Sequence, residues 1–205
     1  REEGVAFVTG AHVGDGENGT LSVRKMVDEA DALLLATGAT VPRDLPIPGR
    51  SLKGVHFAMD FLTRNTRSLL DSNHEDGQYI SAKDKHVIVI GGGDTGSDCI
   101  GTSVRQGAAS VVNFELLPMP GLQRSADQPW PYWPMKLRTT TSHEEAGNQR
   151  EFAILTKSFE SENGRLKALH TVNVEMQRDA VSNAMSLKEI AGTEKTWPCD
   201  LAILA

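Results

Sequence analysis

The sequence lacks several features that mark whole classes of protein. It has no uninterrupted apolar run of about 18 residues, the length that a membrane-spanning helix requires. It has only two cysteines, Cys99 and Cys199, which are too far apart for a Cys-x-x-Cys metal site and too few for a disulfide scaffold. We therefore expect reduced thiols and a cytoplasmic compartment, with an organelle as the alternative. The six histidines show none of the spacings typical of a zinc site, so no metal is expected.

An excess of positive charge is also missing. The 205 residues include 21 Lys and Arg against 27 Asp and Glu, which gives a formal net charge of −6. Because a surface that binds nucleic acid phosphates needs a basic excess, nucleic acid is not expected as a partner. The chain opens on Arg1-Glu2-Glu3-Gly4, without an initiator Met or a signal peptide, and closes on the apolar run 201–205. We expect it to be part of a longer protein.

The strongest local pattern is a β-α-β unit. Residues 86–90 form an apolar run of strand length, residues 94–106 have helical character, and residues 110–115 form a second β-type run. Glycines at 91–93 provide the first turn, and Gly107 can end the helix. A strand, a helix and a second strand within 30 residues indicate two parallel neighbours in an α/β sheet.

Further patterns complete the expected fold. Runs 32–36 and 201–204 are continuously apolar, as in strands buried on both faces of a parallel sheet. Runs 152–160 and 166–176 meet at Asn163-Gly164, a hairpin signal, and 186–190 is predicted to form a third strand. The predicted fold is a Rossmann-like parallel sheet with an antiparallel hairpin or meander. A proline-rich segment near residue 40 predicts a domain boundary.

The first turn of the β-α-β unit carries a phosphate-binding pattern. Gly91, Gly92, Gly93, Asp94, Thr95 and Gly96 fit G-x-G-x-x-G between a strand and a helix. Gly91 permits the tight turn, Gly93 lets the backbone approach a pyrophosphate, and Gly96 lets the helix pack closely. Free N–H groups at the helix N-terminus would bind the phosphates. The pattern predicts a dinucleotide site, and the alternative is a glycine turn without a ligand.

Two charged residues bear on which dinucleotide is bound. Glu115 ends the second strand, 19 residues after Gly96, where an acidic residue accepts hydrogen bonds from the adenosine ribose. A carboxylate there repels a 2′-phosphate, so Glu115 favours NADH over NADPH. Arg124, in the following loop, could reach such a phosphate. The alternative for both residues is a solvated side chain.

The remaining candidates have simpler interpretations. Trp130 and Trp133 could stack a base, but a rigid loop that folds over the domain is favoured. His143, beside two glutamates, could relay a proton. Because hydride transfer between nicotinamide and a flavin needs no side-chain acid or base, a solvated His143 is favoured and no catalytic residue is expected. Cys99 is interpreted as a small buried apolar residue.

Longer segments resemble one enzyme family over nearly the whole chain. They are Ala32–Gly38 (ALLLATG), Asp44–Arg50 (DLPIPGR), Gly54–Leu62 (GVHFAMDFL), Phe114–Pro120 (FELLPMP) and Gln128–Pro134 (QPWPYWP). Together with the glycine turn they resemble the NAD(P)H-binding region of the small-subunit-like part of glutamate synthases. That part is similar to two-domain flavin oxidoreductases such as glutathione reductase and adrenodoxin reductase. Residues 138–145 depart from the family pattern, with threonines where an aromatic and an acidic residue are usual.

The resemblance implies a division of the chain. In this family the nicotinamide domain is inserted into an FAD domain, so residues 1–40 would be a remnant of the FAD-binding half and 41–205 the NAD(P)H-binding domain. Ala36, Thr37 and Gly38 would lie next to the flavin. The family's first glycine motif, for FAD, would precede Arg1. Cys99 and Cys199 do not match the family's iron–sulfur ligands.

The resemblance also implies an activity. NADH or NADPH would give a hydride to FAD, and electrons would pass through iron–sulfur clusters to FMN, where glutamine and 2-oxoglutarate yield glutamate. The partners would be the rest of the FAD domain and the large synthase part. The alternatives are a module of a pyrimidine dehydrogenase or ferredoxin reductase, or a nucleotide sensor without catalysis. Segments 114–120 and 128–134 favour glutamate synthase.

Overall fold

The structure is a computed structural model that describes residues 3–14, 21–39, 41–178 and 185–205. The chain divides into two compact units, Arg1–Val41 and Pro42–Ala205.

The first unit contains one helix, α1 (Val23–Glu29), within its described residues. The helix begins at Ser22, whose hydroxyl accepts a hydrogen bond from the Lys25 N–H at 3.4 Å. The predicted strand at 32–36 is wrong: these residues form no strand, and Leu34 is 89% exposed. An apolar run becomes a strand only where a neighbouring strand completes its hydrogen bonds.

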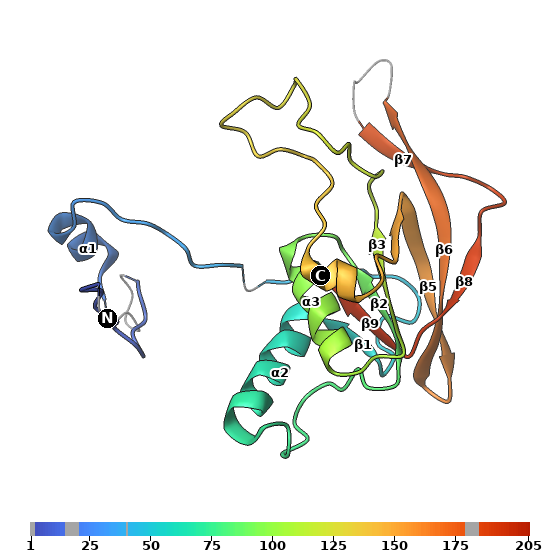
Figure 1. The fold of residues 1–205 in the computed structure, drawn as a ribbon, viewed down its shortest axis with the longest axis horizontal. Coiled ribbons are helices and arrows are strands. Elements are labelled where there is room, and N and C mark those ends of the chain that lie inside the picture. Colours follow the sequence, from blue (N-terminus) through green and yellow to red (C-terminus); the bar gives the residue numbers. More distant parts are fainter. Residues whose placement is uncertain (1–2, 15–20, 40, 179–184) are drawn as a thin grey trace. The chain divides into compact units, whose positions relative to one another are not determined.

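The second unit is built on a five-stranded parallel sheet (Figure 1). Its strand order is β1 (Val55–Phe57), β9 (Leu201–Leu204), β2 (His86–Ile90), β3 (Ser110–Glu115) and β4 (Arg150–Phe152). The predicted β-α-β unit is confirmed as β2, α3 (Asp94–Arg105) and β3. Helices α2 (Ala58–Ser72) and α3 cover one face of the sheet (Figure 1).

The end of α3 follows the predicted glycine cap. Gly107 has φ +83° and its N–H donates to the Val104 carbonyl at 2.9 Å. The Ala108 N–H donates to the Ser103 carbonyl at 3.1 Å. These two hydrogen bonds form a Schellman motif, which turns the chain directly from α3 into β3.

An antiparallel sheet covers the other face of the parallel sheet (Figure 1). It contains β5 (Ile154–Glu162), β6 (Arg165–Arg178), β7 (Met185–Glu189) and β8 (Lys195–Pro198). The hairpin between β5 and β6 is confirmed, and its turn residues Asn163 and Gly164 have φ of 52° and 76°, as a type I′ turn requires. β7 confirms the predicted third strand, whereas β8 was not predicted. The α/β fold class is therefore confirmed.

The parallel sheet has a hydrophobic core on each side, which explains its continuously apolar strands. In β2, Val87 and Val89 pack on the helix side, while Ile88 packs toward the antiparallel sheet. In β9, Leu201 and Ile203 face the helices, and alternate residues face the other sheet. The sheet is thereby fixed on both faces, and only its edges and strand ends are left for ligands.

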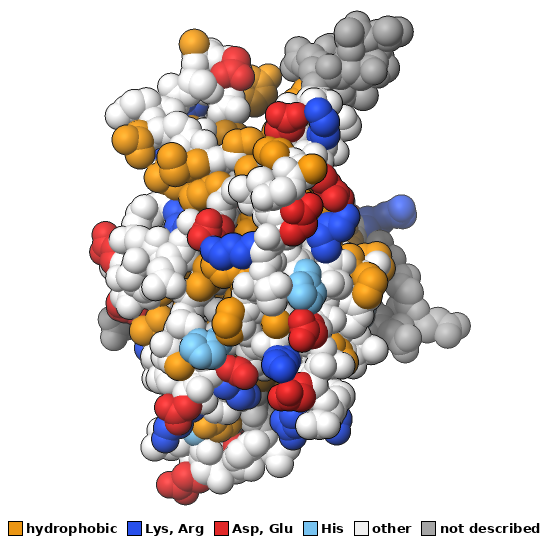
Figure 2. Space-filling view, turned by 90° about the vertical axis from the view of Figure 1, so that its right-hand side faces the viewer, with side chains coloured by type: hydrophobic (Ala, Val, Ile, Leu, Met, Phe, Trp, Pro, Cys, Tyr) orange, Lys and Arg blue, Asp and Glu red, His pale blue; other side chains and the backbone are white. Residues whose placement is uncertain are grey.

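The outward side of the antiparallel sheet carries charged side chains of both signs. Figure 2 shows such side chains interspersed over this side of the molecule, with hydrophobic side chains gathered toward the top of the view. The Lys188–Glu175 pair at 3.3 Å joins β7 to β6, and Lys157 pairs with Glu189. Among the described helices, none is both long enough and apolar enough to cross a membrane.

Candidate dinucleotide-binding site

The turn between β2 and α3 depends on glycine at its first position. Gly91 has φ +123°, a conformation that L side chains rarely adopt, and an added Cβ would overlap the Ala205 carbonyl oxygen. Its N–H donates to the Phe114 carbonyl at 2.9 Å, and its carbonyl accepts from the Asn113 side-chain amide at 2.8 Å. Both backbone polar groups of Gly91 thus bind the turn to β3.

The other two glycines of the motif differ in their surroundings. A Cβ at Gly96 would overlap the Gly91 carbonyl oxygen, so this glycine lets α3 lie directly on the turn. A Cβ at Gly93 would meet no atom within 4 Å, and its φ of −79° is open to any residue. The fold therefore has no need of glycine at 93. The space beside it is open, at the N-terminus of a 12-residue helix whose first N–H groups have no intrahelical acceptor.

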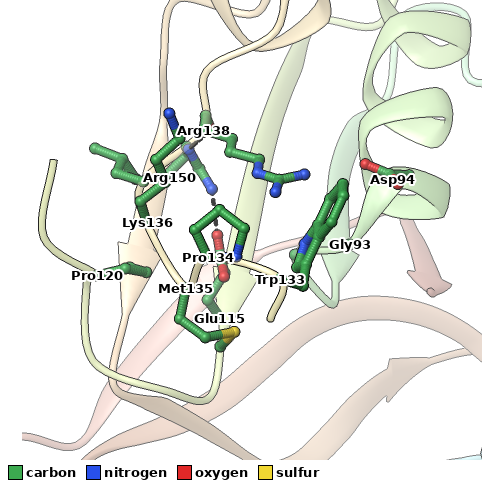
Figure 3. Close-up of a pocket in the computed structure, with 12 residues that line it drawn as sticks. Gly93, Asp94, Glu115, Pro120, Trp133, Pro134, Met135, Lys136, Arg138 and Arg150 are labelled. Atoms are coloured by element: carbon green, nitrogen blue, oxygen red, sulfur yellow. Dashed lines mark hydrogen bonds and ion pairs between the residues drawn. The ribbon is translucent and has the colours of Figure 1, made fainter. Parts of the chain in front are cut away.

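A pocket of about 270 Å³ opens beside this turn. The glycine turn and Glu115 form one wall, and a segment of the loop after β3 forms the other (Figure 3). Its lining residues are Gly92, Gly93, Asp94, Glu115, Pro120, Trp133, Pro134, Met135, Lys136, Leu137, Arg138 and Arg150. Of the predicted site residues, the structure brings four to this pocket: Gly92, Gly93, Asp94 and Glu115.

The Glu115 carboxylate is held against the turn by an ion pair. Arg150 of β4 donates to it (dashed line in Figure 3), and an added Cβ at Gly92 would overlap the same carboxyl group. The side chains of Glu115 and Arg150 are 18% and 10% exposed. Arg150 also donates to the Arg138 carbonyl at 2.8 Å. Glu115 is therefore a fixed, paired carboxylate at the mouth of the pocket and is not a freely solvated side chain.

The other predicted residues lie elsewhere. Arg124 donates to the carbonyls of Gln128 and Tyr132 at 2.8 and 2.9 Å, so it organises its own loop and does not line the pocket. Thr95 is the second residue of α3 and does not line the pocket. Ala36, Thr37 and Gly38 belong to the first unit. The phosphate contact of Arg124 and the flavin contact of 36–38 stay predictions.

Three cationic side chains that the sequence did not predict as site residues also line the pocket: Lys136, Arg138 and Arg150. The Arg138 guanidinium lies over the Trp133 ring, 3.9 Å from its centroid, and both side chains stand beside the glycine turn (Figure 3). No motif or spacing identifies them, because Lys136 and Arg138 are brought to the pocket by the path of the loop after β3, and Arg150 by its place in β4. The pocket is thus rich in donors suited to phosphate oxygens.

His143 is not solvated, and that interpretation was wrong. It lies in the short helix α4 (Thr141–Glu145) and is only 4% exposed. Its Nδ1 accepts from the Thr140 N–H at 3.2 Å and lies 2.8 Å from the Thr140 hydroxyl, so the imidazole caps the helix. Burial, and secondarily the charge of Arg150, lowers the pKa of His143 below its ordinary value of 6.5. His143 holds α4 against Ser97 of α3.

This environment predicts an acid-sensitive contribution to stability. Because the folded state lowers the pKa of His143, the unfolded state binds the proton more readily, and stability falls as the pH drops below 6.5. We expect His143→Gln to be less stable than wild type at pH 8, with a gap that narrows toward pH 5. Thermal unfolding across this range measures the gap. A gap that is constant or widens in acid would show that His143 is not buried in its neutral form.

Comparisons with known proteins place these features in one family. The sequence model of the pyridine nucleotide-disulphide oxidoreductase family matches residues 1–205 of this chain. The chain belongs to that family. The fold is shared with FprA, a Mycobacterium tuberculosis oxidoreductase, which superposes with a TM-score of 0.53 at 15% identity, over 90% of this chain and 52% of FprA.

The sequence relatives of this chain include glutamate synthases. The chain is 51% identical to a glutamate synthase [NADH] of Schizosaccharomyces pombe over its whole length, which is 10% of that protein. It is 42% identical to the glutamate synthase [NADPH] small chain of Bacillus subtilis, also over its whole length, which is 42% of that chain. The resemblance to glutamate synthases is confirmed. The chain spans a tenth to less than half of these curated relatives.

The two cysteines take no part in disulphide chemistry in this structure. Cys99 and Cys199 are both free and buried, and burial raises the pKa of each thiol to about 12. Both are therefore neutral thiols near pH 7, whereas exchange with a disulphide requires the thiolate. The interpretation of Cys99 as a small buried residue is confirmed, since it packs in the helix-side core.

Proposed function

We propose that residues 41–205 are the nicotinamide-dinucleotide module of a glutamate synthase. The module binds NADH or NADPH and presents the nicotinamide to an FAD held by the rest of the FAD-binding half, to which residues 1–40 belong. The electrons then serve glutamate formation from glutamine and 2-oxoglutarate in the large synthase part, through iron–sulfur clusters and FMN. The observation that carries this proposal is the open glycine turn at the start of α3, which faces a pocket lined by two carboxylates, Asp94 and Glu115, and by three cations.

The residues present fit one half of a dinucleotide. The N-terminus of α3 and the open space at Gly93 suit the pyrophosphate, because backbone N–H groups and the helix dipole favour negative charge there. Glu115 suits the adenosine ribose, whose two hydroxyls can donate to a carboxylate. The pocket of about 270 Å³ is below the usual range of about 300–1,000 Å³ for ligand sites, so it accommodates the adenosine side rather than the whole molecule.

The work of this chain is binding and orientation. The bound dinucleotide supplies the hydride, and no side chain is needed as an acid or base. The glycine turn would fix the pyrophosphate, Glu115 would fix the ribose, and Lys136 and Arg138 would balance phosphate charge. These contacts determine the direction in which the nicotinamide extends from the carboxyl ends of the strands.

Cofactor choice is the finer part of the proposal, and we expect NADH to be preferred. The relatives' names include both nucleotides. A 2′-phosphate on Glu115 would place like charges in contact, which costs about 1–4 kcal/mol before screening and predicts a preference for NADH of roughly tenfold. In Glu115→Gln most of this preference should be lost. Dissociation constants of both nucleotides, measured on the full-length protein that carries this chain, give the ratio.

The opposite result has a defined meaning. If wild type prefers NADPH, then Glu115 is not the ribose ligand, and Arg124→Ala becomes the next variant to measure. Reduction of bound FAD by either nucleotide, followed at the flavin absorbance of the full-length protein, separates an oxidoreductase from a nucleotide sensor. A protein that binds NADH and leaves its flavin oxidised would contradict the proposed hydride transfer.

A further inference from the structure

Arg150 of β4 lies at the junction of the pocket and the sheet. One of its terminal nitrogens donates to the Glu115 carboxylate, and the other donates to the Arg138 carbonyl at 2.8 Å. Its guanidinium also lies 5.1 Å from the centroid of the Phe152 ring. Arg150 therefore holds the carboxylate at the end of β3 and the loop that forms the opposite wall of the pocket (Figure 3).

The same side chain leaves one of its own donors unsatisfied. The Nε of Arg150 is buried without a hydrogen-bond partner, and so is the Oδ1 of Asn113, the residue that faces Arg150 in the register of β3 and β4. A buried donor without an acceptor is destabilising. The two unsatisfied atoms lie on residues that are paired between β3 and β4. Arg150 therefore makes its contacts at the pocket although its Nε in the sheet lacks an acceptor.

The charge of Arg150 changes what Glu115 presents to a ligand. A lone carboxylate would repel a 2′-phosphate by its full charge, whereas pairing with a guanidinium weakens this repulsion without removing it. The pair still offers an oxygen to the ribose hydroxyls, since a carboxylate can accept several hydrogen bonds. Discrimination between the nucleotides then depends on whether the guanidinium is engaged by Glu115 or is free to bind phosphate.

We propose that Arg150 is a specificity-determining residue of the dinucleotide site: it positions Glu115 for the ribose of NADH, and it becomes a 2′-phosphate ligand when Glu115 no longer engages it. This inference rests on the proposed function. A guanidinium fork fits phosphate oxygens with two hydrogen bonds, so the released Arg150 matches the one group that distinguishes NADPH from NADH.

The test is a double-mutant cycle in the full-length protein, with Glu115→Gln, Arg150→Met and the double variant. In Glu115→Gln, Arg150 is released, and we expect NADPH to bind at least about fivefold more tightly than to wild type. In the double variant this gain should disappear. In Arg150→Met, Glu115 is unpaired, and the dissociation constant of NADPH should rise by more than that of NADH, by about threefold or more in their ratio.

Arg50 provides a matched control. It pairs with Asp44 at 2.5 Å and lies 4.4 Å from the centroid of the Phe57 ring, so it is also an arginine between a carboxylate and an aromatic ring, and it does not line the pocket. Arg50→Met should leave the ratio of the two dissociation constants unchanged. Arg150→Lys, which keeps the charge without the fork, serves if Arg150→Met fails to fold. When Arg150→Lys is combined with Glu115→Gln, the change in the ratio of the NADPH and NADH dissociation constants should be smaller than in Glu115→Gln alone.

The outcomes separate this inference from the function on which it rests. If wild type binds neither nucleotide, the proposed function fails. If wild type binds both but Glu115→Gln gives the same NADPH affinity with and without Arg150, only the role of Arg150 is overturned. Equal losses for both nucleotides in Arg150→Met and in Arg150→Lys would show a structural role alone, and would also overturn the proposal.

Discussion

Gly93→Val is expected to reduce dinucleotide affinity by about 100-fold or more, which corresponds to about 2.7 kcal/mol, while the fold is retained. The reason is that a side chain at 93 would meet no protein atom within 4 Å and requires no unusual backbone angle. The valine would instead fill the space where the backbone must approach a pyrophosphate. Titration of the full-length protein with NADH, together with its thermal unfolding curve, measures both effects.

Asp94 and the rest of α3 are unchanged in this variant, so the helix N-terminus stays available. Gly93→Ala, with one methyl group, should give an intermediate loss. Unchanged NADH affinity in Gly93→Val would mean that the glycine turn is structural only and that the ligand site lies elsewhere in the protein.

Gly96→Val is expected to damage the fold itself. A Cβ at 96 would overlap the Gly91 carbonyl oxygen, and this backbone atom is already held by the Asn113 amide. Forcing α3 away from the turn should cost about 3 kcal/mol, which lowers the midpoint of thermal unfolding by about 6–12 °C for a domain of this size. Differential scanning calorimetry of the full-length protein gives the shift.

The contrast between Gly93 and Gly96 makes this second expectation specific. The two glycines stand three residues apart in one motif, yet one position should affect affinity and the other stability. A thermal midpoint for Gly96→Val equal to that of Gly93→Val would show that α3 does not depend on close contact with the turn.

The sequence predicted the parts of the fold whose signals are local. The β-α-β unit has apolar strands of five and six residues on either side of a glycine turn, and the β5–β6 hairpin has its own turn residues. Strands β1, β4 and β8 have only three or four residues and exist because a longer neighbour supplies their hydrogen bonds. The run 32–36 shows the converse, since a buried-strand pattern formed no strand without such a neighbour.

The candidate site divides in the same way. Spacing alone placed Gly92, Gly93 and Glu115 at one pocket, because a β-α-β unit fixes the distance between its turn and the end of its second strand. Spacing could not place Arg150, because it is 35 positions from Glu115 in the sequence and lies in a strand too short to be predicted. The partners of Arg124 are backbone carbonyls of its own loop, which carry no sequence signal.

The amide of Asn113 makes the phosphate turn dependent on a residue outside its own motif. Its Nδ2 donates to the carbonyls of Val89 and Gly91, at 3.1 and 2.8 Å, so one side chain in β3 joins the end of β2 to the first residue of the turn. An aspartate of the same shape would set a carboxylate oxygen against two carbonyl oxygens. Segment 86–96 is therefore not a portable unit: transplanted into another sheet, it would carry the glycine pattern but lack the side chain that sets the direction of the Gly91 carbonyl.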